Sequence, residues 1–242
     1  MRDIIIQCQN WLSDQVIKAG ASGIILGLSG GIDSSVLAAL ARNALGRNGV
    51  LGVIMPCHSN PDDEADAKLL AETLDVSFKR VDLSAPFDEI CSTIGVELSP
   101  LVQSNMKARL RMVTLYALGQ QNHLLVCGTS NRSEYETGYF TKYGDSGSDL
   151  MPLASFLKRD IRAMAKSLGV PEKIITKAPS AGLVDGQTDE GDMGFTYDVL
   201  DEYLASGRIN NPSAKQRIDV MRRRSEHKRK PIPIFRPNSN QE

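Results

Sequence analysis

Short apolar runs alternate along this chain with longer stretches in which apolar and polar residues follow helical spacing. The apolar runs have the composition of buried β-strands and cover residues 24–26, 50–55, 76–83 and 124–127. Between them, the spacing predicts helices over residues 36–45, 61–75, 87–94 and about 100–119. Strands that alternate with helices favour an α/β fold, with an open, mostly parallel, doubly wound sheet and helices on both faces.

Amphipathic segments also precede the first predicted strand and follow the fourth. An opening helix is predicted over residues 3–20, with Ile6, Trp11 and Val16 facing inward. Later helices are predicted over residues 154–168, 197–204 and from Ser213, with Gln216 as its capping partner. A length of 242 residues suits a single α/β domain over residues 1–242.

A glycine-rich turn connects the first predicted strand to the next helix. Its nine residues are Gly27, Leu28, Ser29, Gly30, Gly31, Ile32, Asp33, Ser34 and Ser35. Such a turn favours a bound phosphate, because glycine lets the anion approach the backbone closely and the helix start offers unpaired N–H groups and a positive dipole. The turn has neither the lysine of a GxxxxGK[ST] loop nor the spacing of GxGxxG.

The same turn carries one acidic residue, Asp33. A carboxylate repels a phosphate unless a cation lies between them. We therefore expect Mg²⁺ between Asp33 and the phosphates of a bound nucleotide. The alternative is an ordinary Gly/Ser turn in which Asp33 caps the following helix.

Residues 128–153, directly after the fourth predicted strand, are dense in polar residues, glycines and aromatic residues. A segment of this kind is difficult to explain as a connection alone, so it is predicted to bind substrate. Glu134 is a candidate second carboxylate for Mg²⁺, and Thr129 can contact a nucleotide. Lys142 can meet a phosphate or carboxylate, and Asp149 can accept hydrogen bonds from ribose or amide groups. Each residue alone also has an ordinary surface explanation.

The composition of the chain argues against several classes of function. The 28 basic and 29 acidic residues nearly cancel, so the chain lacks the basic field expected of a protein that binds nucleic acid. The four cysteines are far apart with no CxxC pair, which favours reduced thiols over zinc, an iron–sulfur cluster or a disulfide. No signal peptide or membrane span can be drawn, so we expect a cytoplasmic protein without membrane contact.

The turn sequence SGGIDSS, residues 29–35, resembles the pyrophosphate loop of the ATP pyrophosphatases. Motifs further along the chain resemble one family within that group, the NAD synthetases. They include GTSNRSE at 128–134, GYFTKYGDSGSDLMPL at 138–153, LKRDI at 157–161, KAPSAGL at 177–183, GQTDE at 186–190 and HKR at 227–229. The resemblance runs through nearly the whole chain in collinear order, and it implies a Rossmann-like fold of the ATP pyrophosphatase type.

The resemblance also implies roles for individual residues. It assigns ATP to the turn from Gly27 to Ser35 and to Thr129, Lys158 and Ser180, and Mg²⁺ to Asp33 and Glu134. It assigns deamido-NAD to Arg109, Lys142, Asp149, His227 and Lys228. Asp33, Lys158 and Asp149 are the implied catalytic residues, with Asp149 as a candidate acceptor for a proton of ammonium.

The implied reaction is the ATP-dependent amidation of deamido-NAD to NAD by ammonia, the last step of NAD biosynthesis. It proceeds through an adenylated carboxylate and releases AMP and pyrophosphate. The family forms homodimers, so a homodimer is expected. A glutaminase domain is not expected, because the strand–turn–helix unit begins within the first thirty residues.

Two other functions stay open from the residues alone: another adenylating enzyme, such as a tRNA-thiolating or GMP-forming one, and a nucleotide-binding sensor without catalysis. A further expectation concerns residues 179–194, which are rich in glycine and acidic residues. This segment is expected to order over the reactive intermediate and exclude water, with a plain surface loop as the alternative.

Overall fold

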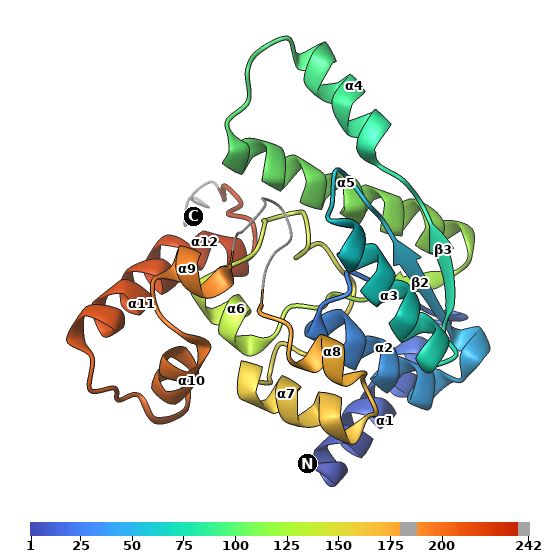
Figure 1. Cartoon of the computed structure of the whole chain (residues 1–242), viewed down its shortest axis with the longest axis horizontal. Coiled ribbons are helices and arrows are strands. Elements are labelled where there is room, and N and C mark those ends of the chain that lie inside the picture. Colours follow the sequence, from blue (N-terminus) through green and yellow to red (C-terminus); the bar gives the residue numbers. More distant parts are fainter. Residues whose placement is uncertain (180–187, 237–242) are drawn as a thin grey trace, which may run out of the picture.

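The computed structural model describes residues 1–179 and 188–236 and contains a four-stranded parallel sheet (Figure 1). Its strands are β1 (Gly23–Gly27), β2 (Val50–Ile54), β3 (Ser77–Arg80) and β4 (Leu124–Val126), in the spatial order β3-β2-β1-β4. In the central strand, Ile24 pairs with Val50 of β2 and with Leu125 of β4. The predicted α/β fold is confirmed. The third strand is shorter than predicted, and all four of its residues are exposed at the sheet edge.

Helices surround the sheet and continue beyond it. Their bounds are α1 (Arg2–Lys18), α2 (Ile32–Leu45), η1 (Arg47–Gly49), α3 (Pro61–Thr73), α4 (Ser84–Ile94), α5 (Pro100–Gln121), α6 (Arg132–Thr137), α7 (Lys158–Ser167), α8 (Glu172–Ile175), α9 (Asp189–Met193), α10 (Tyr197–Ser206), α11 (Pro212–Arg224) and α12 (Glu226–Arg229). In Figure 1 the helices from α9 to α12 form a group beside the sheet layer.

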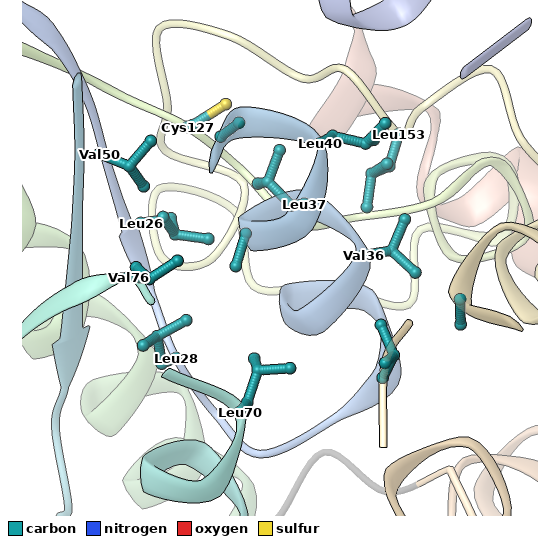
Figure 2. Packing of buried hydrophobic residues seen from close by; sticks show 14 of the residues in the cluster. Leu26, Leu28, Val36, Leu37, Leu40, Val50, Leu70, Val76, Cys127 and Leu153 are labelled. Atoms are coloured by element: carbon teal, nitrogen blue, oxygen red, sulfur yellow. The ribbon is translucent and has the colours of Figure 1, made fainter. Parts of the chain in front are cut away.

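Alternate residues of β1 point to opposite faces of the sheet, as the two-residue period of a strand requires. Ile24 and Leu26 face a core shared with α1, α2, α3 and α7. Figure 2 shows Leu26 and Val50 directed toward Leu37 of α2. On the other face, Ile25 packs in a smaller core with residues of α4 and α5. Both faces of the sheet are therefore covered by helices.

A third apolar cluster joins the helices that follow the sheet. Its buried members are Met193, Phe195, Tyr197, Leu200, Ala214 and Ile218. They come from α9, α10 and α11 and from the turn between α9 and α10. Helix α10 also contacts α6 and α7.

Two details of the predicted helices are wrong. The inward stripe of α1 consists of Ile5, Cys8, Leu12 and Val16, whereas Ile6 and Trp11 are 44% and 40% exposed. The buried residues keep the three- and four-residue spacing of one helix face, and the two exposed residues lie off that face. At the start of α11, Asn211 is the capping residue and accepts from the backbone N–H of Ala214 at 3.1 Å, so the predicted Ser213–Gln216 cap is not formed.

The state of the cysteines agrees with the prediction of reduced thiols. All four cysteines are unpaired, and Cys8, Cys57 and Cys127 are buried. Within residues 1–179 and 188–236, no helix has the length and apolar character needed to cross a membrane.

Candidate active site

A cleft of about 880 Å³ opens at the carboxyl ends of β1, β2 and β4. This is the edge at which open parallel sheets bind their ligands. Eleven residues predicted to form the site line it, namely Gly27, Leu28, Ser29, Gly31, Ile32, Asp33, Ser34, Thr129, Glu134, Lys158 and Lys228. Among the described residues, seven carboxylates but only four basic side chains line this cleft. The cleft therefore has an excess of negative charge.

The glycine-rich turn forms the floor of the cleft between β1 and α2. Gly30 has φ +75°, and a Cβ at this position would collide with the backbone oxygen of Asp63. The hydroxyls of Ser34 and Ser35 both donate to the carbonyl oxygen of Gly31, at 3.0 and 2.8 Å. Gly31 is the N-cap of α2 and makes no side-chain capping hydrogen bond. Asp33 does not cap the helix, so this alternative is excluded.

Lys158 joins the two carboxylates that were predicted to bind a cation. Its Nζ lies 2.6 Å from Asp33 Oδ2 and 3.1 Å from Glu134 Oε1, and its side chain is only 2% exposed. Asn131 donates from Nδ2 to the other oxygen of Asp33, at 2.8 Å. Asn131 and Glu134 also form the capping box of α6, so a local helix start orients both residues.

Local structure explains why Lys158 points into the cleft. It is the first residue of α7, which begins four positions later than predicted. Its backbone N–H donates to the hydroxyl of Ser133 at 3.1 Å. The inward residues Leu157, Ile161 and Met164 are buried as expected.

Burial and charge act together on this cluster. Burial and the negative charge of Asp33 raise the pKa of Glu134 above its usual range. Burial by itself would lower the pKa of Lys158, but the charges of Asp33 and Glu134 outweigh it and raise that pKa. Burial also raises the pKa of the neighbouring Asp189. A single ammonium group therefore offsets the negative charge of three carboxylates that repel one another.

Asn131, Asp189 and Tyr197 belong to this cluster but were not predicted as site residues from the sequence. The hydroxyl of Tyr197 lies 2.9 Å from Asp189 Oδ2 and 3.3 Å from Glu134 Oε1. Its ring centroid is 4.8 Å from the Nζ of Lys158. Asp189 belongs to the GQTDE motif, which was a usable signal. No sequence pattern marked Tyr197 as a site residue, because a single tyrosine at a helix start is ordinary.

The model of one protein family, described as NAD synthase, matches residues 4–232 of the chain. The NH(3)-dependent NAD(+) synthetase of Finegoldia magna is 51% identical over 220 residues, which cover 91% of this chain and 90% of that protein. This chain belongs to the NAD synthase family.

Solved structures of similar proteins agree with this membership in the NAD synthase family. An NMN synthetase from Francisella tularensis is 37% identical, with a TM-score of 0.92 and coverage of 98% of both chains. An NH3-dependent NAD synthetase from Campylobacter jejuni is 29% identical, with a TM-score of 0.81 and coverage of 97% of this chain and 98% of that chain.

The sequence predicted Arg109 of α5 as a site residue, but the structure places Arg111 of the same helix in the cleft. Arg111 lines it and donates to the backbone oxygen of Met55 at 3.1 Å and to the hydroxyl of Ser59 at 3.2 Å. Arg109 is exposed, does not line the cleft, and donates to the backbone oxygen of Lys142 at 3.3 Å. Residues two apart on a helix face different directions, so only one of them can reach a given cavity.

Helix α12, near the end of the chain, contacts the predicted substrate segment. Lys228 donates to the backbone oxygens of Gly138 and Phe140, at 2.8 and 2.6 Å. Lys142 donates to the backbone oxygen of His227 at 2.8 Å. Of Lys142, His227 and Lys228, only Lys228 lines the cleft.

The predicted residue Asp149 does not line the cleft. Asp149 is exposed, and its two oxygens accept from the hydroxyl of Tyr116 at 3.0 Å and from the backbone N–H of Val126 at 2.8 Å. Ser180 lies outside the described residues, as does half of the predicted closing segment, residues 180–187.

Proposed function

We infer that this chain catalyses the ATP-dependent amidation of deamido-NAD to NAD with ammonia, the last step of NAD biosynthesis. The enzyme is then a ligase that forms a C–N bond. The observation that carries this inference is the 51% identity with an NH(3)-dependent NAD(+) synthetase over 91% of the chain. The glycine-rich turn and the Lys158 cluster supply the groups that this chemistry needs.

Amidation needs a better leaving group than a carboxylate can offer. An oxygen of the nicotinate carboxylate attacks the α-phosphorus of ATP, and pyrophosphate leaves. Ammonia then attacks the carboxyl carbon of the adenylate, and AMP leaves. Negative charge gathers on the pyrophosphate and α-phosphate oxygens in the first step. The ammonium of Lys158 and the N–H groups at the start of α2 are placed to stabilise it.

We further propose that Asp33 and Glu134 hold Mg²⁺. Carboxylate oxygens are the ligands that this hard cation prefers. The excess of carboxylates around Lys158 supports an added positive charge, because a single ammonium leaves the mutual repulsion of Asp33, Glu134 and Asp189 only partly balanced. When bound, the ion would neutralise charge on the phosphates of ATP.

The remaining assignments are proposals that rest on family resemblance. Arg109, Lys142, Asp149 and His227 would contact deamido-NAD beside the cleft, and Ser180 would contact ATP. Asp149 would accept a proton from ammonium. The reactants are small molecules, and nucleic acid has no part in the reaction.

We also propose a cytoplasmic homodimer of single-domain chains. Exposed apolar side chains along α4 and α5 support a subunit interface there. They are Ile90, Ile94, Leu101, Val102 and Val113. The four reduced cysteines are consistent with a reducing compartment.

A second candidate substrate is nicotinic acid mononucleotide, which would be amidated to NMN. The observation that favours it is the higher TM-score and identity with the NMN synthetase, 0.92 and 37%, than with the NAD synthetase from Campylobacter jejuni, 0.81 and 29%. The same Lys158 cluster would serve both substrates, because the carboxylate that reacts is the same.

The deciding experiment is an endpoint assay with purified protein and Mg²⁺–ATP. Deamido-NAD and nicotinic acid mononucleotide are supplied in separate reactions, each with ammonium or with glutamine. We expect NAD and matching AMP from deamido-NAD and ammonium. A faster reaction with the mononucleotide would change the substrate but keep the chemistry. The absence of AMP in every reaction would refute the proposed function.

A further inference from the structure

Helix α10 is connected to Lys158 at both the backbone and the ammonium group of that residue. The backbone connection runs through Ser133, and the ammonium group is contacted directly. At the backbone end, Asp201 of α10 accepts from the N–H of Arg159 at 2.8 Å and from the hydroxyl of Ser133, which in turn accepts from the N–H of Lys158. At the ammonium end, the ring of Tyr197 lies 4.8 Å from Nζ. Tyr197 and Asp201 are four positions apart and so share one face of α10.

Tyr197 is held rigidly where it contacts Lys158. Its side chain is fully buried and packs in the apolar cluster of α9, α10 and α11. Its backbone N–H donates to Glu190 Oε1 at 2.8 Å, and Thr196 caps the helix one residue earlier. An aromatic face attracts an ammonium group most strongly when water is excluded, and Lys158 is almost completely buried.

The hydroxyl of Tyr197 adds a second constraint. It lies between Oδ2 of Asp189 and Oε1 of Glu134, the oxygen of Glu134 that also contacts Lys158. The ring and the hydroxyl thus restrict the lysine and one of its carboxylate partners at the same time. A flexible four-carbon side chain fixed in this way loses its freedom during folding rather than during the reaction.

We propose that Tyr197 is a positioning residue for Lys158: its ring holds the ammonium group at the phosphate end of the cleft, and its hydroxyl aligns Glu134 beside it. This inference rests on the proposed function, because it assigns Tyr197 to the adenylation step. Ammonia attacks only after that step. Loss of Tyr197 should therefore slow adenylation and leave kcat/KM for ammonium unchanged.

The test compares Tyr197→Phe, which keeps the ring, with Tyr197→Leu, which removes it. Single-turnover formation of pyrophosphate is measured in the wild type and in both variants, together with kcat/KM for ammonium in steady state. We expect adenylation to fall about threefold in Tyr197→Phe and about thirtyfold in Tyr197→Leu. If Tyr197→Leu does not fold, pentafluorophenylalanine at position 197 keeps the ring size and removes its negative face, and about a tenfold loss relative to Phe is expected.

Tyr203 provides a matched control on the same helix. Its ring also lies near a lysine, with Lys215 Nζ at 5.4 Å, and its hydroxyl contacts Asp219, but it does not line the cleft. Tyr203→Phe and Tyr203→Leu should keep the wild-type adenylation rate. A wild-type rate in folded Tyr197→Leu, or equal losses at both tyrosines, would overturn the inference. A wild type that forms no AMP would instead refute the proposed function itself.

Discussion

Two clusters in the same cleft each combine a lysine with two carboxylates, yet they differ in charge balance. In the first, Lys158 contacts Asp33 and Glu134. In the second, Lys177 contacts Asp63 and Asp66, each at 2.7 Å. Both Lys158 and Lys177 line the cleft.

The second cluster is balanced because a further lysine joins it. Lys173 of α8 contacts the other oxygen of Asp66 at 2.6 Å, so two ammonium groups meet two carboxylates. Burial by itself would raise the pKa of Asp66, but hydrogen bonds from Lys173 and Lys177 outweigh it and lower that pKa. The pKa of Glu134 moves in the opposite direction.

The difference in charge balance distinguishes two roles that lysines and carboxylates have in this cleft. The balanced cluster ties α3 to α8 and to the segment after it, and its charges are satisfied. The Lys158 cluster has more negative than positive charge, which is costly in a buried place unless a ligand brings a cation. Charge balance, and not composition, distinguishes the first cluster, which we propose as a site, from the second, which we propose as a structural contact.

The largest expected effect is on turnover. Asp33→Asn should lower kcat at least about 1000-fold with an unchanged fold, because the site loses a charge on which the phosphates and the added cation depend. Asp63→Asn, in the balanced cluster, should lower kcat less than about tenfold. Steady-state NAD formation and circular dichroism check both variants. Near-normal turnover in Asp33→Asn would remove the role proposed for it.

The second prediction concerns stability. Asp66→Asn should lower the free energy of unfolding by about 2 kcal/mol, because two lysines lose a buried carboxylate partner. Urea denaturation measures the change. Glu226→Gln is a suitable control, since Glu226 pairs with Lys230 at an exposed position and such pairs contribute about 0.3–0.5 kcal/mol. Equal losses in the two variants would contradict the structural role of the Asp66 cluster.

The third prediction uses metal binding in the absence of nucleotide. Lys158→Met should bind Mn²⁺ about tenfold more tightly than the wild type, because Asp33 and Glu134 lose the cation that competes for them. Lys177→Met should show wild-type affinity. Free Mn²⁺ can be followed by electron paramagnetic resonance. An unchanged affinity in Lys158→Met would show that the ammonium and the metal do not share these carboxylates.

The smallest effect is a dependence on pH. The pKa of Asp66 is lower in the folded protein than its ordinary value of 3.8, so its stabilising contribution is present above that value and is lost as pH falls through the folded-state pKa. The stability difference between wild type and Asp66→Asn should stay constant from about pH 5 to 8 and narrow below about pH 4. Urea denaturation at several pH values measures it. If the stability difference between wild type and Asp66→Asn widened in acid, the pKa of Asp66 would be raised in the folded protein and the prediction would be wrong.

Short-range patterns in the sequence predicted much of the site. The turn from Gly27 to Ser35 depends on neighbouring residues only, and a strand, a glycine turn and a helix start are visible in the chain itself. Motif order identified the family that the comparisons confirm. The cap of α11 and the inward face of α1 were wrong, because several nearby residues could fill each role and packing selected among them.

The sequence by itself determined three features. They are the strand–turn–helix unit, the alternation of strands and helices that makes the parallel sheet, and membership in the family. The first depends on neighbouring residues only, and the other two depend on the order of short patterns along the chain. Only the tertiary structure decided that Lys158 meets Asp33, 125 positions away, that Arg111 and not Arg109 enters the cleft, and that Tyr197 lies under the ammonium group. Such pairs depend on how packed helices orient side chains across the fold, and no local pattern encodes that orientation.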